Sequence, residues 1–114
     1  MSNILIISSD ITRANNLSTI LTFLGEPCSW VLFASAVEAL RDRSDIKSVL
    51  IDADSHELAC DISDKFPHQP FVLVGDYETY KLQTNIVGSI SEPITYSVLT
   101  QMLHRCQEYK RIQP

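Results

Sequence analysis

Polar residues that could bind a metal ion or a phosphate group follow three apolar segments of this sequence. The segments cover residues 4–7, 49–51 and 87–91, and the residues after them are Ser8, Ser9 and Asp10, then Asp52, and finally Glu92 and Pro93. If the segments are parallel strands of an α/β sheet, their carboxyl ends meet at the edge where such folds bind ligands. The residue types at that edge therefore decide which chemistry the chain can perform.

The size and charge of the chain limit what surrounds this edge. Its 114 residues form one domain, spanning 1–114, and an apolar content of 45% supplies an ordinary core. A net charge of −5 without a lysine or arginine cluster argues against nucleic-acid binding. We find no apolar run long enough to span a membrane and no signal peptide, so we expect a cytoplasmic protein that binds no membrane.

Cysteine and histidine residues show no spacing that indicates a metal site or a disulfide framework. The three cysteines, Cys28, Cys60 and Cys106, are an odd number and include no Cys-x-x-Cys pair. We interpret them as small buried or half-buried apolar side chains. The three histidines are equally scattered, so we expect no metal ligands among them.

The first half of the chain alternates predicted strands and helices. A strand over residues 4–8 precedes a helix whose apolar residues recur at helical spacing, namely Leu17, Ile20, Leu21 and Leu24. Gly25 predicts the end of this helix. A second strand is predicted over 28–33, and the next helix begins at Ser35, which has capping-box spacing to Glu38.

The second half continues the alternation. We predict strands over 48–51, 71–74 and 87–91, helices over 58–65 and 79–84, and a final helix that Thr95 caps and that runs through Arg111. Five β-α units predict a five-stranded parallel sheet with right-handed crossovers. The expected fold is therefore α/β, a doubly wound, flavodoxin-like (βα)5 sandwich of three α/β/α layers.

This order of elements resembles the CheY-like receiver domain of response regulators over the whole chain. In that family, acidic residues after the first strand hold magnesium, and an aspartate after the third strand accepts a phosphoryl group. A hydroxyl after the fourth strand contacts the phosphoryl group, and a lysine after the fifth strand, followed by proline, neutralises its charge. The resemblance implies that these positions are occupied here by Ser8 and Ser9, Asp52, Gly75 and Glu92, so only Asp52 and Pro93 match.

The substitutions remove interactions that phosphoryl transfer needs. Magnesium prefers carboxylate oxygens, and the neutral hydroxyls of Ser8 and Ser9 are weaker ligands. Glu92 places a negative charge where the family has a positive one, and two like charges about 4 Å apart repel by roughly 4 kcal/mol at an effective dielectric constant near 20. Gly75 lacks the hydroxyl that senses phosphorylation. We therefore predict a non-enzymatic domain without a cofactor or magnesium, in which Asp52 is a vestigial acceptor.

A second interpretation keeps the chain a functional receiver that is phosphorylated at Asp52 in a two-component system. Asp10 and Asp54 could then supply the missing carboxylates, Asp10 through a one-residue shift of register. The more common role of an aspartate such as Asp10 is to cap the first helix. A third interpretation is an unrelated flavodoxin-like domain that binds a ligand, and the absence of a Gly-rich phosphate loop after the first strand argues against it.

A narrower resemblance is to the degenerate N-terminal receivers of flagellar master regulators, the FleQ and FlrA group of σ54-dependent transcriptional activators. It rests on the segment 17–26, on the depleted acidic pocket with its Glu92-Pro93 step, and on Leu99, Leu103 and Tyr109 in the final helix. The resemblance implies a longer protein with covalently linked ATPase and DNA-binding domains. No Walker A or helix-turn-helix motif occurs in these 114 residues, so ATP, DNA and cyclic di-GMP binding are expected elsewhere.

Without catalysis, the expected function is regulation by contact, through dimerisation or through the attached domains. The final helix carries two neighbouring apolar stripes, one of Leu99, Leu103 and Cys106 and one of Val98, Met102 and Tyr109. We expect the first stripe to face the sheet and the second to be partly exposed. The resemblance implies a homodimer contact on this face, with Tyr80 and Leu82 of the preceding helix contributing.

Overall fold

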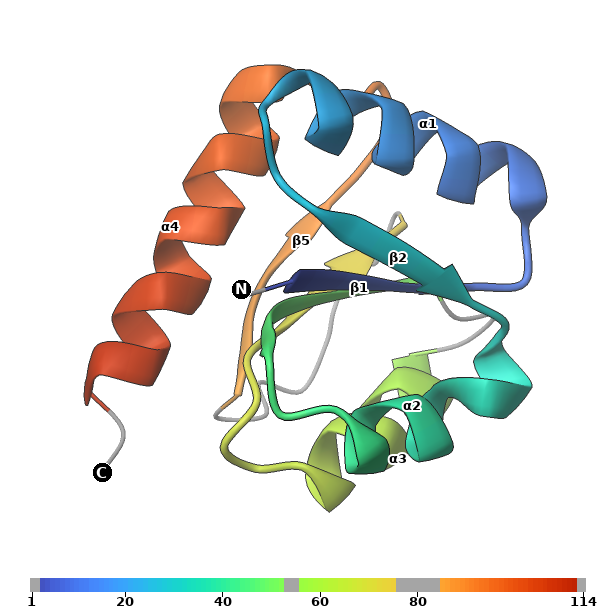
Figure 1. Cartoon of the computed structure of the whole chain (residues 1–114), viewed down its shortest axis with the longest axis vertical. Helices are drawn as coiled ribbons and strands as arrows, with labels where there is room; N and C mark the ends of the chain where they lie inside the picture. The colour runs from blue at the N-terminus through green and yellow to red at the C-terminus, as the bar shows by residue number, and fades with distance from the viewer. Residues whose placement is uncertain (1–2, 53–55, 76–84, 113–114) are drawn as a thin grey trace.

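Five parallel strands form one sheet between two layers of helices in the computed structural model, which describes residues 3–52, 56–75 and 85–112 (Figure 1). The strand order is β2-β1-β3-β4-β5, with α1 and α4 on one face and α2 and α3 on the other. In chain order the elements are β1 (Asn3–Ser8), α1 (Ile11–Phe23), β2 (Cys28–Val31), η1 (Phe33–Ser35), α2 (Ala36–Asp42), β3 (Ile46–Asp52), α3 (His56–Lys65), β4 (Phe71–Val74), β5 (Ile86–Ile90) and α4 (Tyr96–Ile112). This arrangement confirms the predicted doubly wound α/β fold.

The strands supply core residues to both layers, because a parallel sheet is covered on its two faces. In β1, Leu5 and Ile7 pack with the α2–α3 layer, while Ile4 and Ile6 pack with the α1–α4 layer. All four side chains are fully buried. The uninterrupted apolar run at the start of the sequence therefore reflects a strand in the middle of the sheet, between β2 and β3.

Helix α1 has a complete cap at each end. The side chain of Asp10 accepts hydrogen bonds from the backbone N–H groups of Thr12 and Arg13, as an N-cap does. At the other end, the N–H of Gly25 donates to the Thr22 carbonyl and the N–H of Glu26 to the Leu21 carbonyl. This is the Schellman arrangement, and it requires the positive φ of 78° that Gly25 adopts. The predicted end of the helix at Gly25 is confirmed.

The segment between β2 and α2 differs from the prediction. The predicted strand continues to residue 33, but β2 ends at Val31 and a 3-10 turn over Phe33–Ser35 leads into α2. The Ser35 side chain makes no capping hydrogen bond, so the predicted capping box with Glu38 is wrong. The physical reason is the backbone: Ser35 closes the 3-10 turn through its N–H to Leu32, with φ and ψ of −99° and 3° instead of the extended conformation of an N-cap.

Helix α4 packs closely on β5. Thr95 accepts a hydrogen bond from the N–H of Val98, which confirms the predicted N-cap. Met102 is only 6% exposed and lies over Gly88, where an added Cβ would stand 2.6 Å from the methionine sulfur. Within the described residues no helix is long and apolar enough to cross a membrane. The predicted helix over 79–84 lies outside the described residues.

Candidate functional site

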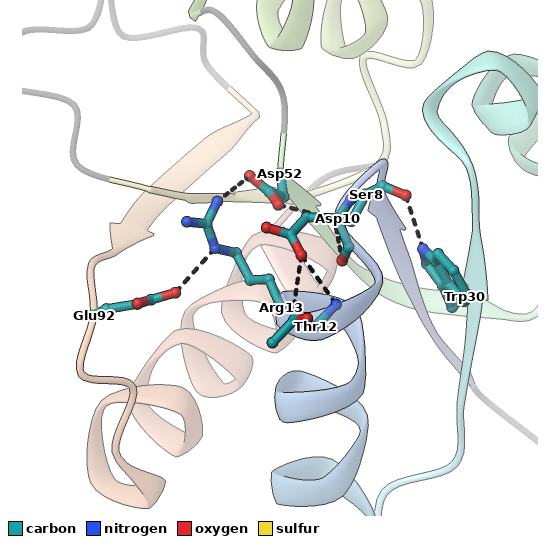
Figure 2. Close-up of polar contacts among 7 residues, drawn as sticks. All are labelled: Ser8, Asp10, Thr12, Arg13, Trp30, Asp52 and Glu92. Atoms are coloured by element: carbon teal, nitrogen blue, oxygen red, sulfur yellow. Dashed lines mark hydrogen bonds and ion pairs between the residues drawn. The ribbon is translucent and has the colours of Figure 1, made fainter.

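The carboxyl ends of three strands meet at one edge of the sheet, as the sequence predicts. Ser8 at the end of β1 is in register with Asp52 at the end of β3, and Glu92 follows β5. Ser8 is fully buried, and Asp52 is 8% exposed. The start of α1 lies beside these residues, because only Ser9 and Asp10 separate β1 from the helix (Figure 2). We call the set Ser8, Arg13, Asp52 and Glu92 the mouth.

Both carboxylate oxygens of Asp52 are engaged by other side chains. The Ser8 hydroxyl donates to Oδ2 at 2.8 Å, and Nη1 of Arg13 donates to Oδ1 at 2.8 Å. A nearly buried carboxylate is stable only when it is paired and hydrogen-bonded, and here both conditions are met. Asp52 is therefore held in the folded domain as a partner in an ion pair.

Arg13 connects Asp52 to Glu92. Its Nε lies 3.0 Å from Oε1 of Glu92, so one guanidinium bridges the ends of β3 and β5 (Figure 2). The hydrogen bond to Glu92 raises the pKa of Arg13, partial burial opposes this, and the interactions with Asp52 raise it further. The negative charge that the sequence analysis identifies at Glu92 is thus paired with a cation from α1. Among the described residues of this edge, the cation that pairs with Asp52 and Glu92 comes from the first helix, whereas the residue after the last strand is acidic.

Two further hydrogen bonds hold the turn between β1 and α1. The backbone N–H of Asp10 donates to the Ser8 hydroxyl at 3.0 Å, and the Ser8 hydroxyl in turn donates to Asp52. The indole N–H of Trp30 donates to the Ser8 carbonyl at 2.8 Å. The Asp10 carboxylate caps α1. These contacts set the position of Arg13 in the first turn of the helix.

The residues at the mouth do not fit a receiver-type magnesium site. Such a site needs several oxygen ligands with at least one free carboxylate. Both oxygens of the Asp52 carboxylate accept hydrogen bonds, from Ser8 and Arg13, and Oδ1 of the exposed Asp10 accepts those of the helix N-terminus. In residues 3–52, 56–75 and 85–112, no three His, Cys, Asp or Glu side chains lie together as metal ligands. A guanidinium beside the acceptor also repels a dication.

The other predicted site residues lie around the mouth without joining the ion pairs. Ser9 and Pro93 are exposed. Gly75 is half-buried and its N–H donates to the Ile90 carbonyl, so only its backbone is used. Asp54 lies outside the described residues. The predicted convergence at this edge therefore holds for Ser8, Asp52 and Glu92.

Arg13 is the residue of the candidate site that the sequence analysis missed. Asp10 is the N-cap of α1, which places Arg13 three residues later in the positive first turn. Cations are unfavourable there, and acidic residues are preferred. An arginine at that position needs carboxylate partners. The acidic residues expected at the nearby sheet edge were therefore the sequence signal that could have identified its role.

The predicted dimer face is partly exposed at Val98 and Tyr109, which are half-buried, but not at Met102. Met102 is buried over Gly88, and Val98 packs against the core of the α1–α4 layer. The Tyr109 hydroxyl donates to the Pro67 carbonyl at 2.7 Å. The expectation that this stripe is partly exposed is therefore wrong for Met102, because the missing side chain of Gly88 leaves room for it. Tyr80 and Leu82 lie outside the described residues, and dimerisation stays a prediction.

A family model described as flagellar regulatory protein FleQ matches residues 3–108 of the chain. The search of curated proteins finds no match to the chain. Among solved structures, the chain is similar to NtrX from Brucella abortus, with a TM-score of 0.76 and 20% identity over 98% of this chain and 28% of NtrX. The chain thus spans about a quarter of the length of that protein.

Two structures of single receiver domains are similar over nearly their full length. A CheY-like receiver domain protein from Methanospirillum hungatei JF-1 gives a TM-score of 0.74 and 19% identity over 99% of both chains. The signal receiver domain of a signal transduction histidine kinase from Syntrophus aciditrophicus gives a TM-score of 0.78 and 19% identity, over 100% of this chain and 96% of that one. Both likenesses show the receiver fold.

Proposed function

Since the chain belongs to the family of the flagellar regulatory protein FleQ, we propose that it is a receiver-like regulatory domain that works without ordinary phosphorylation. The observation that carries the proposal is the position of Arg13, which bridges Asp52 and Glu92. The guanidinium occupies the space beside the acceptor where a phosphoryl group and a metal ion would bind. The domain thus keeps the receiver fold and replaces its reactive site with a fixed ion pair.

The chemistry of phosphoryl transfer supports this interpretation. Transfer depends on positioning the phosphodonor and on neutralising its charge, mainly with magnesium and a cationic side chain. Here the acceptor oxygens of Asp52 already have donors at 2.8 Å, and attack by Oδ1 would first require Arg13 to leave. Glu92 adds a negative charge on the same side as Arg13. The engaged oxygens of Asp52 oppose nucleophilic attack, and the charge of Glu92 opposes the approach of an anionic donor.

We infer that the domain regulates by contact as part of a σ54-dependent transcriptional activator that controls flagellar genes. The family match supports a regulatory domain of this type. In such a protein, the linked ATPase and DNA-binding domains would act on the promoter, and this domain would contact them or a second copy of itself. Binding of nucleic acid by the domain itself is not expected from a chain of net charge −5.

Intact-mass spectrometry after incubation with acetyl phosphate and magnesium tests the proposal. We expect no phosphoryl adduct on the wild-type chain, while an active receiver domain treated in parallel gains one. An Asp52→Asn variant is the matched control, because any adduct it retains does not come from the acceptor position. A stable adduct on the wild type that is absent in Asp52→Asn would contradict the proposal.

One observation favours the alternative, a functional receiver phosphorylated at Asp52. Arg13 is a cation next to the acceptor and could neutralise a phosphoryl group in place of the missing lysine. If this were its role, Arg13→Met would abolish an adduct that the wild type forms. On the main proposal neither protein forms one, so the same mass measurement separates the two functions.

A further inference from the structure

Two exposed aromatic side chains stack where the end of α1 meets the start of α4. The ring centroids of Phe23 and Tyr96 are 5.0 Å apart, with an interplanar angle of 25°. Phe23 is 75% exposed and Tyr96 is 50% exposed. Figure 1 shows the two helix ends side by side. Stacking limits the freedom of both rings, and ordered, exposed aromatic residues are typical anchors of protein interfaces.

An open groove of about 670 Å³ begins beside this pair. Leu24, the residue after Phe23, and Thr100, one helical turn after Tyr96, both line it. From there the groove runs between α4 and the start of β3, with Leu103 on its α4 wall. The aromatic pair and the groove therefore form one continuous surface, which has an apolar end and leads away from the mouth.

The far end of the groove is basic, although the chain as a whole has a net charge of −5. Lys47, His104 and Lys110 line it against a single acid, Glu26, which pairs with Lys47. Nζ of Lys110 donates to the backbone carbonyl of Ile46, and partial burial lowers the pKa of Lys110. Among the described residues no carboxylate forms an ion pair with this ammonium. An anionic group placed in the groove would supply one.

We propose that this surface, the aromatic–basic groove, binds an acidic amphipathic segment of a partner protein. An apolar side chain of the segment would pack on Phe23, Tyr96 and Leu103, and its carboxylates would reach Lys110 and His104. Charge complementarity favours such a partner over a symmetric second copy of the chain, whose own groove would bring the same cations. The proposal rests on the contact function proposed above and gives that contact a location and a chemistry.

Fluorescence anisotropy with a labelled synthetic peptide tests it directly. The probe is a short helical peptide with leucines on one face and glutamates along its flanks, titrated with the 114-residue chain. We expect saturable binding that weakens about tenfold in Lys110→Met, the effect of losing about 1.4 kcal/mol of interaction. Phe23→Ser should weaken it to a similar degree. Lys65→Met, at the end of α3 on the opposite face, is the matched control and should bind as the wild type does.

The peptide itself provides the second control. Replacing its glutamates by glutamines should weaken binding as much as Lys110→Met does, and circular dichroism should show that each variant is folded. The proposal is overturned if no binding occurs, or if Lys110→Met and the glutamine peptide leave the affinity unchanged. It is also overturned if the chain is a dimer that Phe23→Ser converts to a monomer, because a second copy then occupies the groove. An adduct on Asp52 would contradict the proposed function alone.

Discussion

The two edges of the sheet satisfy their polar side chains in different ways. At the carboxyl edge, the charged side chains pair with one another, because Arg13 bridges Asp52 and Glu92. At the amino edge, Lys47 also pairs with Glu26, but Lys110 and Asn85 donate to backbone carbonyls instead, Lys110 to Ile46 and Asn85 to residues in and after α3. At the carboxyl edge the charges of the described residues are therefore paired with one another, whereas the amino edge retains Lys110, which has no ion-pair partner among the described residues and lines the aromatic–basic groove. Under the two proposals above, the surface that contacts partners lies away from the mouth.

The largest loss of stability is expected from a substitution at the amino edge, Asn85→Ala. This residue is 4% exposed, and its Nδ2 donates to the carbonyls of Ser63, Phe66 and Gln69 at 2.9 to 3.1 Å. Asn85→Ala removes this donor from carbonyls in the last turn of α3 and in the segment that follows it, so the free energy of unfolding should fall by about 3 kcal/mol. Urea denaturation measures it. Asn16→Ala on the exposed side of α1 is the control and should change stability by less than about 0.5 kcal/mol.

A smaller loss is expected at the carboxyl edge from Arg13→Met. The variant removes the cation from the nearly buried Asp52 carboxylate, and the free energy of unfolding should fall by about 1 to 2 kcal/mol because Arg13 itself is 31% exposed. Urea denaturation again measures the change. Glu92→Gln is the matched variant on the exposed arm of the same bridge. If it were as damaging as Arg13→Met, the inner pair with Asp52 would not be the important one.

The smallest expected effect is a pH dependence at Lys110. Partial burial lowers its pKa in the folded chain below the ordinary value of 10.5. Between these two values the unfolded chain binds more protons than the folded one, so this group makes stability rise with pH in that alkaline window. Below the window the unfavourable contribution is constant. Comparing the urea midpoint of the wild type and Lys110→Met across the window should show a smaller rise in the variant; equal slopes would exclude the effect.

The comparison of the two edges also explains what the sequence could reveal. Strand β4 is predicted at its observed bounds, and the α1 caps at Asp10 and Gly25 are found, because these depend on local patterns. Convergence of Ser8 and Asp52 follows from the parallel topology. The bridge by Arg13 was missed because it joins residues 39 and 79 positions apart.

The donors at the amino edge were still harder to predict. Asn85 and Lys110 donate to backbone carbonyls. Every residue has such a carbonyl, so the residue types in the sequence do not indicate which one is the acceptor. Met102 was assigned to an exposed stripe because its helical position borders the buried one. Its burial depends on the missing side chain of Gly88, which lies on another element.

The hydrogen bond from Trp30 to the Ser8 carbonyl places the single tryptophan of the chain beside the mouth. The domain therefore carries an intrinsic fluorophore at the edge where its relatives react. Because the emission of an indole responds to the loss of such a bond and to water, movement of the turn between β1 and α1 can be followed without a label. A partner that opens this edge should therefore change the fluorescence emission of Trp30.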